Sequence, residues 1–312
     1  MFQQDRLNSE LTFFQKVKKL DYVLLFCLTL LSIISLLVMY STDGGEILHH
    51  TKSHFIKLVT FFPLMLVISF FNIKIWHIIS YFFYFIILLL LIWVSIFGIK
   101  VSGSQRWIDL YLIVLQPSEL MKIAIILCLA KYYHRLKIDN VNSITRVLIP
   151  LIIITAPIIL VLSQPDLGTS VLIASSGLII LWLGGVKIKY FFYSFITFLI
   201  SLPFIISFLK PYQKLRILTF LDPDRDPLGA GYQIIQSKIA IGSGGFDGKG
   251  FLKGTQSYLD FLPEKHTDFI FTLFSEEFGF LGSICLLLLY AIIIIRIIQI
   301  GAISRSNFAK LF

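Results

Sequence analysis

Four ionisable residues stand directly before the last long apolar run of the sequence. The stretch FLPEKHTDFIF contains Glu264, Lys265, His266 and Asp268, and Phe269 follows at once. A carboxylate at the edge of a membrane helix loses hydration, which makes it a better base near neutral pH. Asp268 is therefore a candidate general base. The alternatives are an interfacial carboxylate that stays in water and one that pairs with Lys265.

The acidic and imidazole groups around Asp268 carry less information. His266 alone indicates little more than a hydrogen-bonding residue at an interface. Glu276 and Glu277 lie about two helical turns further along. Ionised side chains at that depth need a cavity or a partner.

A second polar cluster occupies the stretch SGSQRWIDLYLIVLQPSELMK. Arg106 and Trp107 suit a bulky amphipathic substrate, by charge and by stacking. An interfacial Trp beside a snorkelling Arg explains the same two residues equally well. Glu119 and Lys122 share one helix face and can neutralise each other within the membrane, which is also compatible with a purely structural ion pair. Asp166, in QPDLGTS, is expected on the same outer side.

Two further motifs resemble known sites and fail on inspection. DPDRDPLGAGYQ has Asp at alternate positions, as a calcium loop does, but Pro227 and Gln233 replace the required Gly and Glu. GSGGFDGKG resembles a phosphate loop, but Ser243 and Gly250 replace its first Gly and its final Ser or Thr. The glycine-rich backbone remains suited to close approach to a ligand or to a re-entrant turn.

The composition indicates a polytopic membrane protein, because 57% of the residues are hydrophobic and only 14% are charged. A spanning helix needs about 20 mostly apolar residues, and candidate segments of that kind recur along the whole chain. We therefore predict an all-α protein with about eight transmembrane helices. The segments are 22–40, 54–71, 76–98, 118–134, 145–163, 168–186, 189–209 and 270–298.

The distribution of Lys and Arg predicts a cytoplasmic N-terminus and places FLPEKHTD outside. The net charge of +9 is then a topology signal and does not indicate nucleic-acid binding. Segment 1–20 is expected on the cytoplasmic side, as a membrane-surface helix or a solvated basic tail. Segment 210–269 is expected to form a long outer loop, and loops of that length are usually functional or disordered.

Several of these stretches resemble, in order, the motifs of the SEDS family, which includes RodA and FtsW. They are GSQRWIDL, QPSELMK, QPDLGTS, DPLGAGYQIIQSKIAIGSGGFDGKG, GTQSYLDFLPEKHTDFIF and EEFGFLG. The resemblance runs from about Asp21 to the end of the chain. QSKIAIGSGG and GTQS are more similar to RodA than to FtsW.

The resemblance implies a peptidoglycan glycosyltransferase in the bacterial inner (plasma) membrane, acting on its outer face in cell elongation and rod-shape maintenance. The implied substrate is lipid II, and the implied partners are a class B penicillin-binding protein and the elongation complex. A divalent cation, Mg²⁺ or Mn²⁺, is a further expectation, with no motif for its ligands. Asp268 matches the essential loop aspartate of the family and is the expected general base. The expected substrate-binding residues are Arg106, Trp107, Glu119, Lys122, Arg216 and Glu264.

The chain departs from the family in its number of helices. The family normally has ten spans, whereas we expect eight in a single SEDS-type domain over 1–312, with the C-terminal part of the family fold absent. The chain is then either truncated or a reduced homologue. Two alternative functions follow, a lipid II flippase and an inactive scaffold of the elongation machinery. Outer polar clusters favour the transferase over the flippase, and retention of Asp268 argues against the scaffold.

Overall fold

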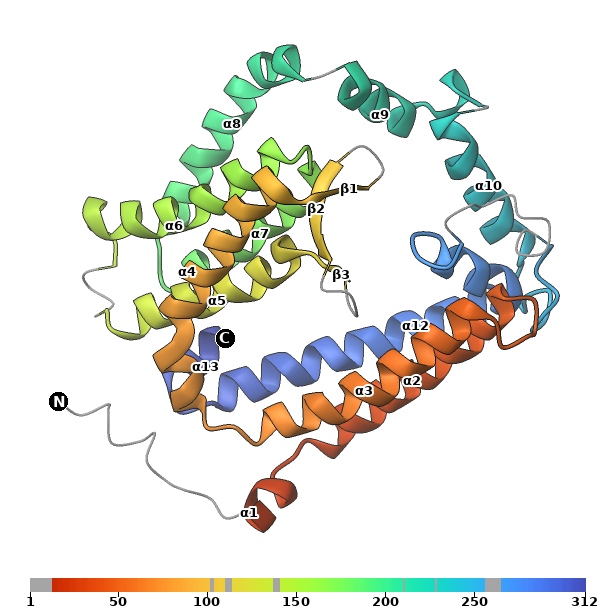
Figure 1. The fold of residues 1–312 in the computed structure, drawn as a ribbon, viewed down its shortest axis with the longest axis horizontal. Coiled ribbons are helices and arrows are strands. Elements are labelled where there is room, and N and C mark those ends of the chain that lie inside the picture. Colours follow the sequence, from red (N-terminus) through yellow and green to blue (C-terminus); the bar gives the residue numbers. More distant parts are fainter. Residues whose placement is uncertain are drawn as a thin grey trace. The chain divides into compact units, whose positions relative to one another are not determined.

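Each of the eight predicted spans is a helix in the structure, which is a computed structural model (Figure 1). It describes residues 13–101, 104–109, 114–136, 141–209, 211–227, 229–255 and 265–312. Five of these helices, α2, α3, α4, α6 and α12, are long and apolar enough to cross a membrane, and α7 and α8 contain shorter apolar stretches. The bounds are α2 Tyr22–Thr42, α3 His49–Ser69, α4 Ile73–Phe97, α5 Pro117–His134, α6 Ile144–Ser163, α7 Leu167–Leu183, α8 Ile188–Phe208 and α12 Ile270–Ile303. The prediction of a helical, polytopic membrane protein is thus confirmed.

The predicted outer loop 210–269 contains regular structure. It includes α9 (Pro211–Leu221), the 3₁₀ turn η3 (Pro223–Arg225) and α10 (Ala230–Ser243). Proline begins α9, where its missing N–H costs nothing. The segment predicted as a long outer loop thus connects α8 and α12, and its described part contains these short helices. Two further short helices, α1 (Phe13–Lys18) and α13 (Asn307–Leu311), lie near the ends of the chain.

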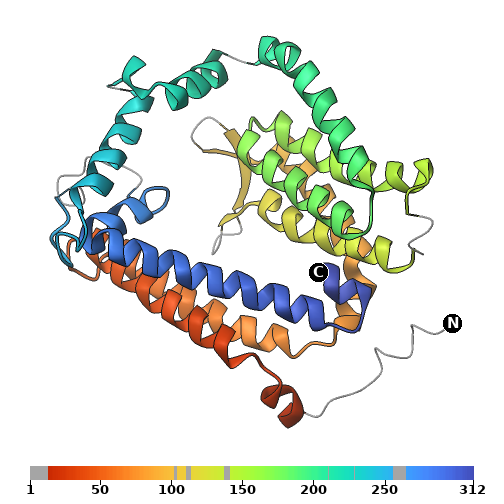
Figure 2. The ribbon, with the colours of Figure 1, turned by 180° about the vertical axis from the view of Figure 1, so that it is seen from behind.

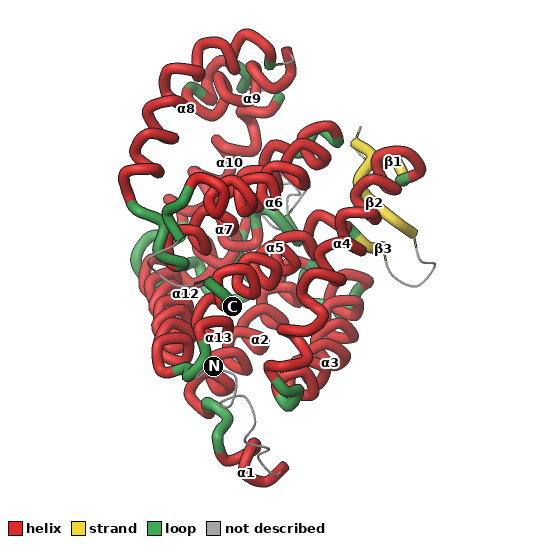
Figure 3. The backbone as a smooth tube through the Cα atoms, turned by 90° about the vertical axis from the view of Figure 1, so that its left-hand side faces the viewer, coloured by secondary structure: helices red, strands yellow, loops and turns green. Residues whose placement is uncertain are grey.

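Three short strands precede α5 and are yellow in Figure 3. They are β1 (Ile99–Val101), β2 (Ser104–Asp109) and β3 (Val114–Leu115), and they pair antiparallel in the order β1-β2-β3. Ile99 pairs with Trp107, and Ile108 pairs with Leu115. This small sheet carries Arg106 and Trp107, in a region that the sequence did not predict to be extended.

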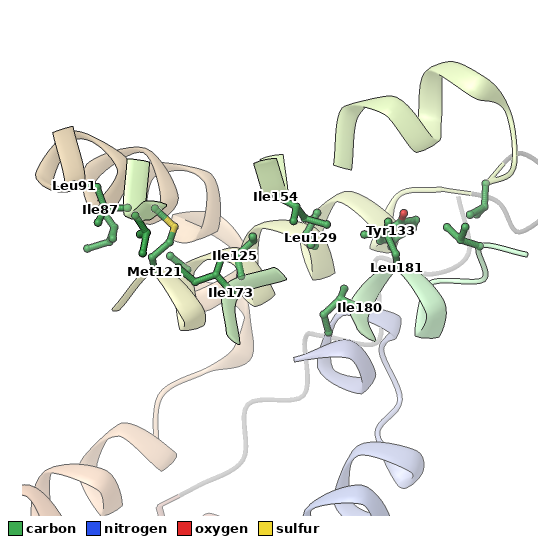
Figure 4. Packing of buried hydrophobic residues seen from close by; sticks show 14 residues of the cluster. Ile87, Leu91, Met121, Ile125, Leu129, Tyr133, Ile154, Ile173, Ile180 and Leu181 are labelled. Carbon is green, nitrogen blue, oxygen red and sulfur yellow. The ribbon is translucent and has the colours of Figure 1, made fainter. Parts of the chain in front are cut away.

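The chain forms two compact units. The described part of the first unit lies within Phe71–Leu199 and Ile300–Phe312. Its core lies between α4, α5, α6 and α7, where Leu91, Met121, Ile125 and Ile173 are fully or almost fully buried (Figure 4). Helix α5 contributes more residues to this core than any other helix, so Glu119 and Lys122 stand on a well-packed helix of this unit.

The second unit comprises Thr12–Phe70 and Ile200–Gln299. Helices α2, α3 and α12 run side by side in both views (Figures 1 and 2). Cys27 of α2 packs against Leu289 and Ile293 of α12. Asp21 caps α2, and its carboxylate accepts from the Leu24 N–H and from Arg296, contacts that lower its pKa.

Helix α12 is interrupted at Gly279, where φ is 63° and ψ is −162°. The glycine-rich segment after α10 fills this break with backbone hydrogen bonds. The N–H groups of Lys249 and Gly250 donate to the carbonyls of Glu276 and Glu277, at 3.0 and 2.9 Å. In return, the N–H of Phe280 donates to the carbonyl of Gly245, at 3.0 Å. These glycines therefore allow a close backbone approach, and the partner is a helix of the same chain.

Candidate active site

Asp268 lies on the turn that leads into α12, in the second unit. Its side chain is exposed, and within the described part of the chain its carboxylate makes no hydrogen bond or ion pair. The loss of water expected at this position is therefore not produced by the described residues. The structure places an accessible carboxylate two residues before the start of helix α12.

His266, two residues earlier, is fixed to the turn between α2 and α3. Its Nδ1 lies 2.9 Å from Thr42 Oγ1 and 3.9 Å from the carboxylate of Asp43. Its ring stacks on that of His50, with the centroids 3.9 Å apart and the planes at 12°. The side chain predicted to be little more than a hydrogen-bonding interface residue thus lies against three residues, two at Nδ1 and one on a ring face.

Asp43, which ends α2, is itself held by the first turn of α3. Its Oδ2 accepts from the N–H of Thr51 at 2.8 Å and from the Thr51 hydroxyl at 2.6 Å. The Asp43 side chain is 3% exposed. Because these donors hold the Asp43 carboxylate in place, it constrains the position of the His266 imidazole beside it.

Glu276 and Glu277 also have polar partners, as expected for ionised side chains within an apolar helix. Glu276 Oε1 accepts from Lys249 Nζ at 2.7 Å, from the Thr255 N–H at 2.9 Å and from the Thr255 hydroxyl at 2.8 Å. Ser41 of α2 donates to Glu277 Oε1. Both glutamates are buried, so α12 is joined to the glycine-rich segment and to α2 through charged and polar groups.

Breaking the Glu276–Lys249 pair should lower stability. In Lys249→Met the fully buried Glu276 carboxylate loses the ammonium group of Lys249. We expect a loss of about 2–3 kcal/mol, less than for a wholly buried pair because Lys249 is 28% exposed. Thermal unfolding in detergent measures the effect.

Lys253→Met serves as the matched control, since Lys253 is an exposed lysine of the same segment. The double change Lys249→Met with Glu276→Gln should restore part of the stability, because no unpaired charge remains. Equal unfolding temperatures for Lys249→Met and Lys253→Met would show that the ion pair contributes nothing.

The first unit contains the other charged candidates. Arg106 Nη1 donates to Asp166 Oδ2 at 3.0 Å, and Nη2 donates to the Pro165 carbonyl at 3.3 Å. Asp166 also caps α7, since it accepts from the N–H of Thr169 at 3.1 Å and from its hydroxyl at 2.9 Å. Arg106 is therefore oriented by residues at the start of α7. Asp166 lies on the same side of the first unit as Arg106, since the two side chains are in contact.

The two roles of Asp166 can be separated by substitution. Asn caps helices about as well as Asp, so Asp166→Asn should remove only the charge that faces Arg106. We expect Asp166→Asn to cost up to about 1 kcal/mol, and Asp166→Ala to cost about 1 kcal/mol more. Thermal unfolding of the two variants tests this order. An Asp166→Asn variant that unfolds at a lower temperature than Asp166→Ala would refute it.

Trp107 and the Glu119–Lys122 pair complete this set. Trp107 is half-buried on β2. Lys122 Nζ lies 2.8 Å from Glu119 Oε2, which confirms the pairing predicted from their spacing. The Lys122 side chain is 25% exposed and that of Glu119 is 54% exposed, so both remain accessible to a ligand.

The remaining candidates are only partly described. Arg216 lies on α9, and its side chain is outside the described residues, as is the whole of Glu264. Among the residues that are described, no group of three or more His, Cys, Asp or Glu side chains is arranged to hold a metal ion. We therefore assign no metal ligands.

The residues of the α2–α3 turn escaped the sequence analysis. Thr42 and Asp43 lie in STDGGE, a short polar interruption between two apolar runs, which by itself predicts only a turn. Their partner His266 is more than two hundred positions away, so nothing in the local pattern connects them. The DGG signal identifies the turn but not its role.

Comparison with known proteins assigns the family. The sequence profile described as "Cell cycle protein", of FtsW, RodA and SpoVE, matches residues 18–312. The chain belongs to the FtsW/RodA/SpoVE family. A relative from Escherichia coli K12 named peptidoglycan glycosyltransferase MrdB is 40% identical over 300 residues, which are 96% of this chain and 80% of MrdB.

Solved structures of similar fold agree with this FtsW/RodA/SpoVE assignment. Thermus thermophilus rod shape determining protein RodA aligns with a TM-score of 0.63 at 21% identity, covering 94% of this chain and 81% of RodA. A structure reported as a peptidoglycan synthase complex that coordinates polymerization and crosslinking aligns with a TM-score of 0.79 at 24% identity. It covers 94% of this chain and 81% of that one. The fold of this family member is therefore that of a multi-pass membrane protein.

Proposed function

We propose that this chain is a peptidoglycan glycosyltransferase that joins the disaccharide units of lipid II into glycan strands during cell elongation. Membership of the family over residues 18–312 and 40% identity to MrdB support the reaction class. The main support for the site is the position of Asp268. Its carboxylate is exposed on a turn that contacts α2 and α3 through His266 and continues into α12.

In the proposed reaction the 4-hydroxyl of one lipid II attacks the anomeric carbon of the growing chain. Asp268 accepts the hydroxyl proton as the new C–O bond forms. The bond between the anomeric carbon and the pyrophosphate oxygen breaks, and the lipid pyrophosphate leaves with the bonding electrons. A carboxylate suits this role because its oxygen can accept the hydroxyl proton, and the Asp268 side chain is exposed.

The pyrophosphate requires cations as its charge develops. We assign this role to Arg106, Lys122 and Arg216. Asp166 orients Arg106, and the guanidinium retains N–H donors that neither Asp166 nor Pro165 uses. Lys122 is held by its ion pair with Glu119. Trp107 and Glu264 are proposed to contact the lipid or sugar groups.

The site is proposed to face the outer surface of the inner membrane, with the N-terminus in the cytoplasm, as the distribution of Lys and Arg indicates. A class B penicillin-binding protein is the proposed partner. Support for a partner comes from the similar fold of the chain in the peptidoglycan synthase complex.

The test uses vesicles that contain labelled lipid II, the purified chain and a class B penicillin-binding protein. Glycan strands on a gel are the expected product. Movement of lipid II between the leaflets is measured in the same vesicles. Transbilayer movement without strands would replace the transferase with a flippase, and neither activity from a folded chain would favour a scaffold.

A further inference from the structure

We propose that His266 is a positioning residue that sets the location of Asp268, an inference that rests on the proposed function of Asp268 as the base. The carboxylate of Asp268 makes no hydrogen bond or ion pair within the described residues. The neighbouring His266 contacts Thr42, Asp43 and His50, which all belong to the α2–α3 region of the same unit.

The hydrogen bonds of Thr42 assign the proton on the imidazole. A threonine hydroxyl has a single proton, and that of Thr42 is donated to the carbonyl of Met39 at 2.7 Å. With that proton committed to Met39, Thr42 Oγ1 accepts in its 2.9 Å contact with His266, and we assign the N–H to Nδ1. The Asp43 carboxylate, 3.9 Å from the same nitrogen, favours this tautomer.

The imidazole is restricted in the other directions as well. The parallel ring of His50 covers one of its faces at 3.9 Å. Asp43 cannot move away, because Thr51 holds its other oxygen with two hydrogen bonds. The side chain of His266 is thus fixed in position, in ring plane and in tautomer.

This constraint is transmitted to Asp268 over a short length of backbone. Asp268 lies two residues after His266 and two before Ile270, where α12 begins. The N–H of Ile270 donates to the carbonyl of Thr267 at 3.5 Å, and that of Leu273 to the carbonyl of Phe269 at 3.3 Å. Asp268 is therefore attached at one end to a clamped imidazole and at the other to a helix. Loss of the contacts of His266 would leave the turn that carries Asp268 attached only to helix α12.

Two substitutions of His266 by side chains of nearly equal size distinguish the effect of the N–H donor from the effect of side-chain size. Asn places an amide N–H at the same bond distance from Cβ as His Nδ1, whereas Leu has no donor. We expect His266→Leu to lower kcat for lipid II polymerisation on the order of 10²-fold with KM little changed, because the base is misplaced while substrate binding persists. His266→Asn should retain most of the native kcat. Thr42→Val should behave like His266→Leu, and Thr42→Ser like the native chain.

His54→Leu is the matched control, since His54 is a partly buried histidine of α3 bonded to Ser35 and away from Asp268. It should leave kcat unchanged. Equal kcat values for His266→Leu and the native chain, or equal losses in His266→Asn and His266→Leu, would overturn the positioning role while leaving the proposed function intact.

A second measurement is independent of catalysis. Hydrogen–deuterium exchange over residues 265–269 should be faster in His266→Leu than in the native chain, and close to native in His266→Asn. Identical exchange in all three would refute the clamp, whether or not the chain makes glycan. Failure of the native chain to polymerise lipid II, with exchange as expected, would remove only the proposed function.

Discussion

Asp268→Asn should lower the rate of glycan formation by about 10²–10⁴-fold, the usual contribution of a general base. Asn is nearly isosteric with Asp and cannot accept the proton of the acceptor hydroxyl. Because the side chain is exposed and makes no contact within the described residues, folding should be unaffected. The measurement is the initial rate of strand formation from labelled lipid II, with thermal unfolding of the same samples.

Asp224→Asn is the control for this experiment, since Asp224 is another exposed aspartate of the second unit. We expect its rate to equal that of the native chain. A native rate in Asp268→Asn would remove Asp268 from the mechanism. A rate lost in step with the unfolding temperature would give Asp268 a structural role instead.

Gly248→Ala should be among the most destabilising single substitutions in the second unit. Gly248 has φ +83°, where side chains are strained, and an added Cβ would overlap the carbonyl of Glu277 at the break in α12. Strain and overlap together should cost about 2–5 kcal/mol. The expected observation is a large fall in the thermal unfolding temperature in detergent.

Two neighbouring glycines provide a graded control. Gly245→Ala meets the strain alone, because φ is +58° and no atom lies within 4 Å of an added Cβ, so we expect a loss of about 1–2 kcal/mol. Gly242 lies in α10 with open space around it, and Gly242→Ala should stabilise the helix by up to about 1 kcal/mol. Any other order of the three unfolding temperatures would contradict the close packing against α12.

The helices could be predicted from the sequence because apolar runs of spanning length leave few alternatives. The spacing of Glu119 and Lys122 was equally informative, since residues three apart on a helix are neighbours regardless of the rest of the fold. Asp268 could be selected because a carboxylate at the edge of a membrane helix loses hydration and becomes a candidate base.

The contacts that fix the site could not be predicted in this way. Arg106 and Asp166 are 60 positions apart, and Glu276 and Lys249 are 27 apart. Neither pair is joined by one helix or one hairpin, so no periodic pattern brings them together. The small sheet around Arg106 was missed for a related reason. Its strands are two to six residues long and lie within a segment that also suits an interfacial turn.

The glycine-rich segment illustrates a third limit. Its composition predicts close backbone approach but does not identify the partner. The partner is the interrupted helix α12, whose break at Gly279 is hidden in a long apolar run that reads as continuous. Only the three-dimensional arrangement connects Gly248 with Glu277.

The most direct test of the central claim compares the lipid pyrophosphate released with the glycosidic bonds formed. The native chain and Asp268→Asn are each incorporated with a class B penicillin-binding protein into vesicles that contain labelled lipid II. We predict equal amounts of released pyrophosphate and new bonds from the native chain, and almost none of either from Asp268→Asn. Strands and pyrophosphate at the native level from Asp268→Asn, or none from a folded native chain, would contradict the account.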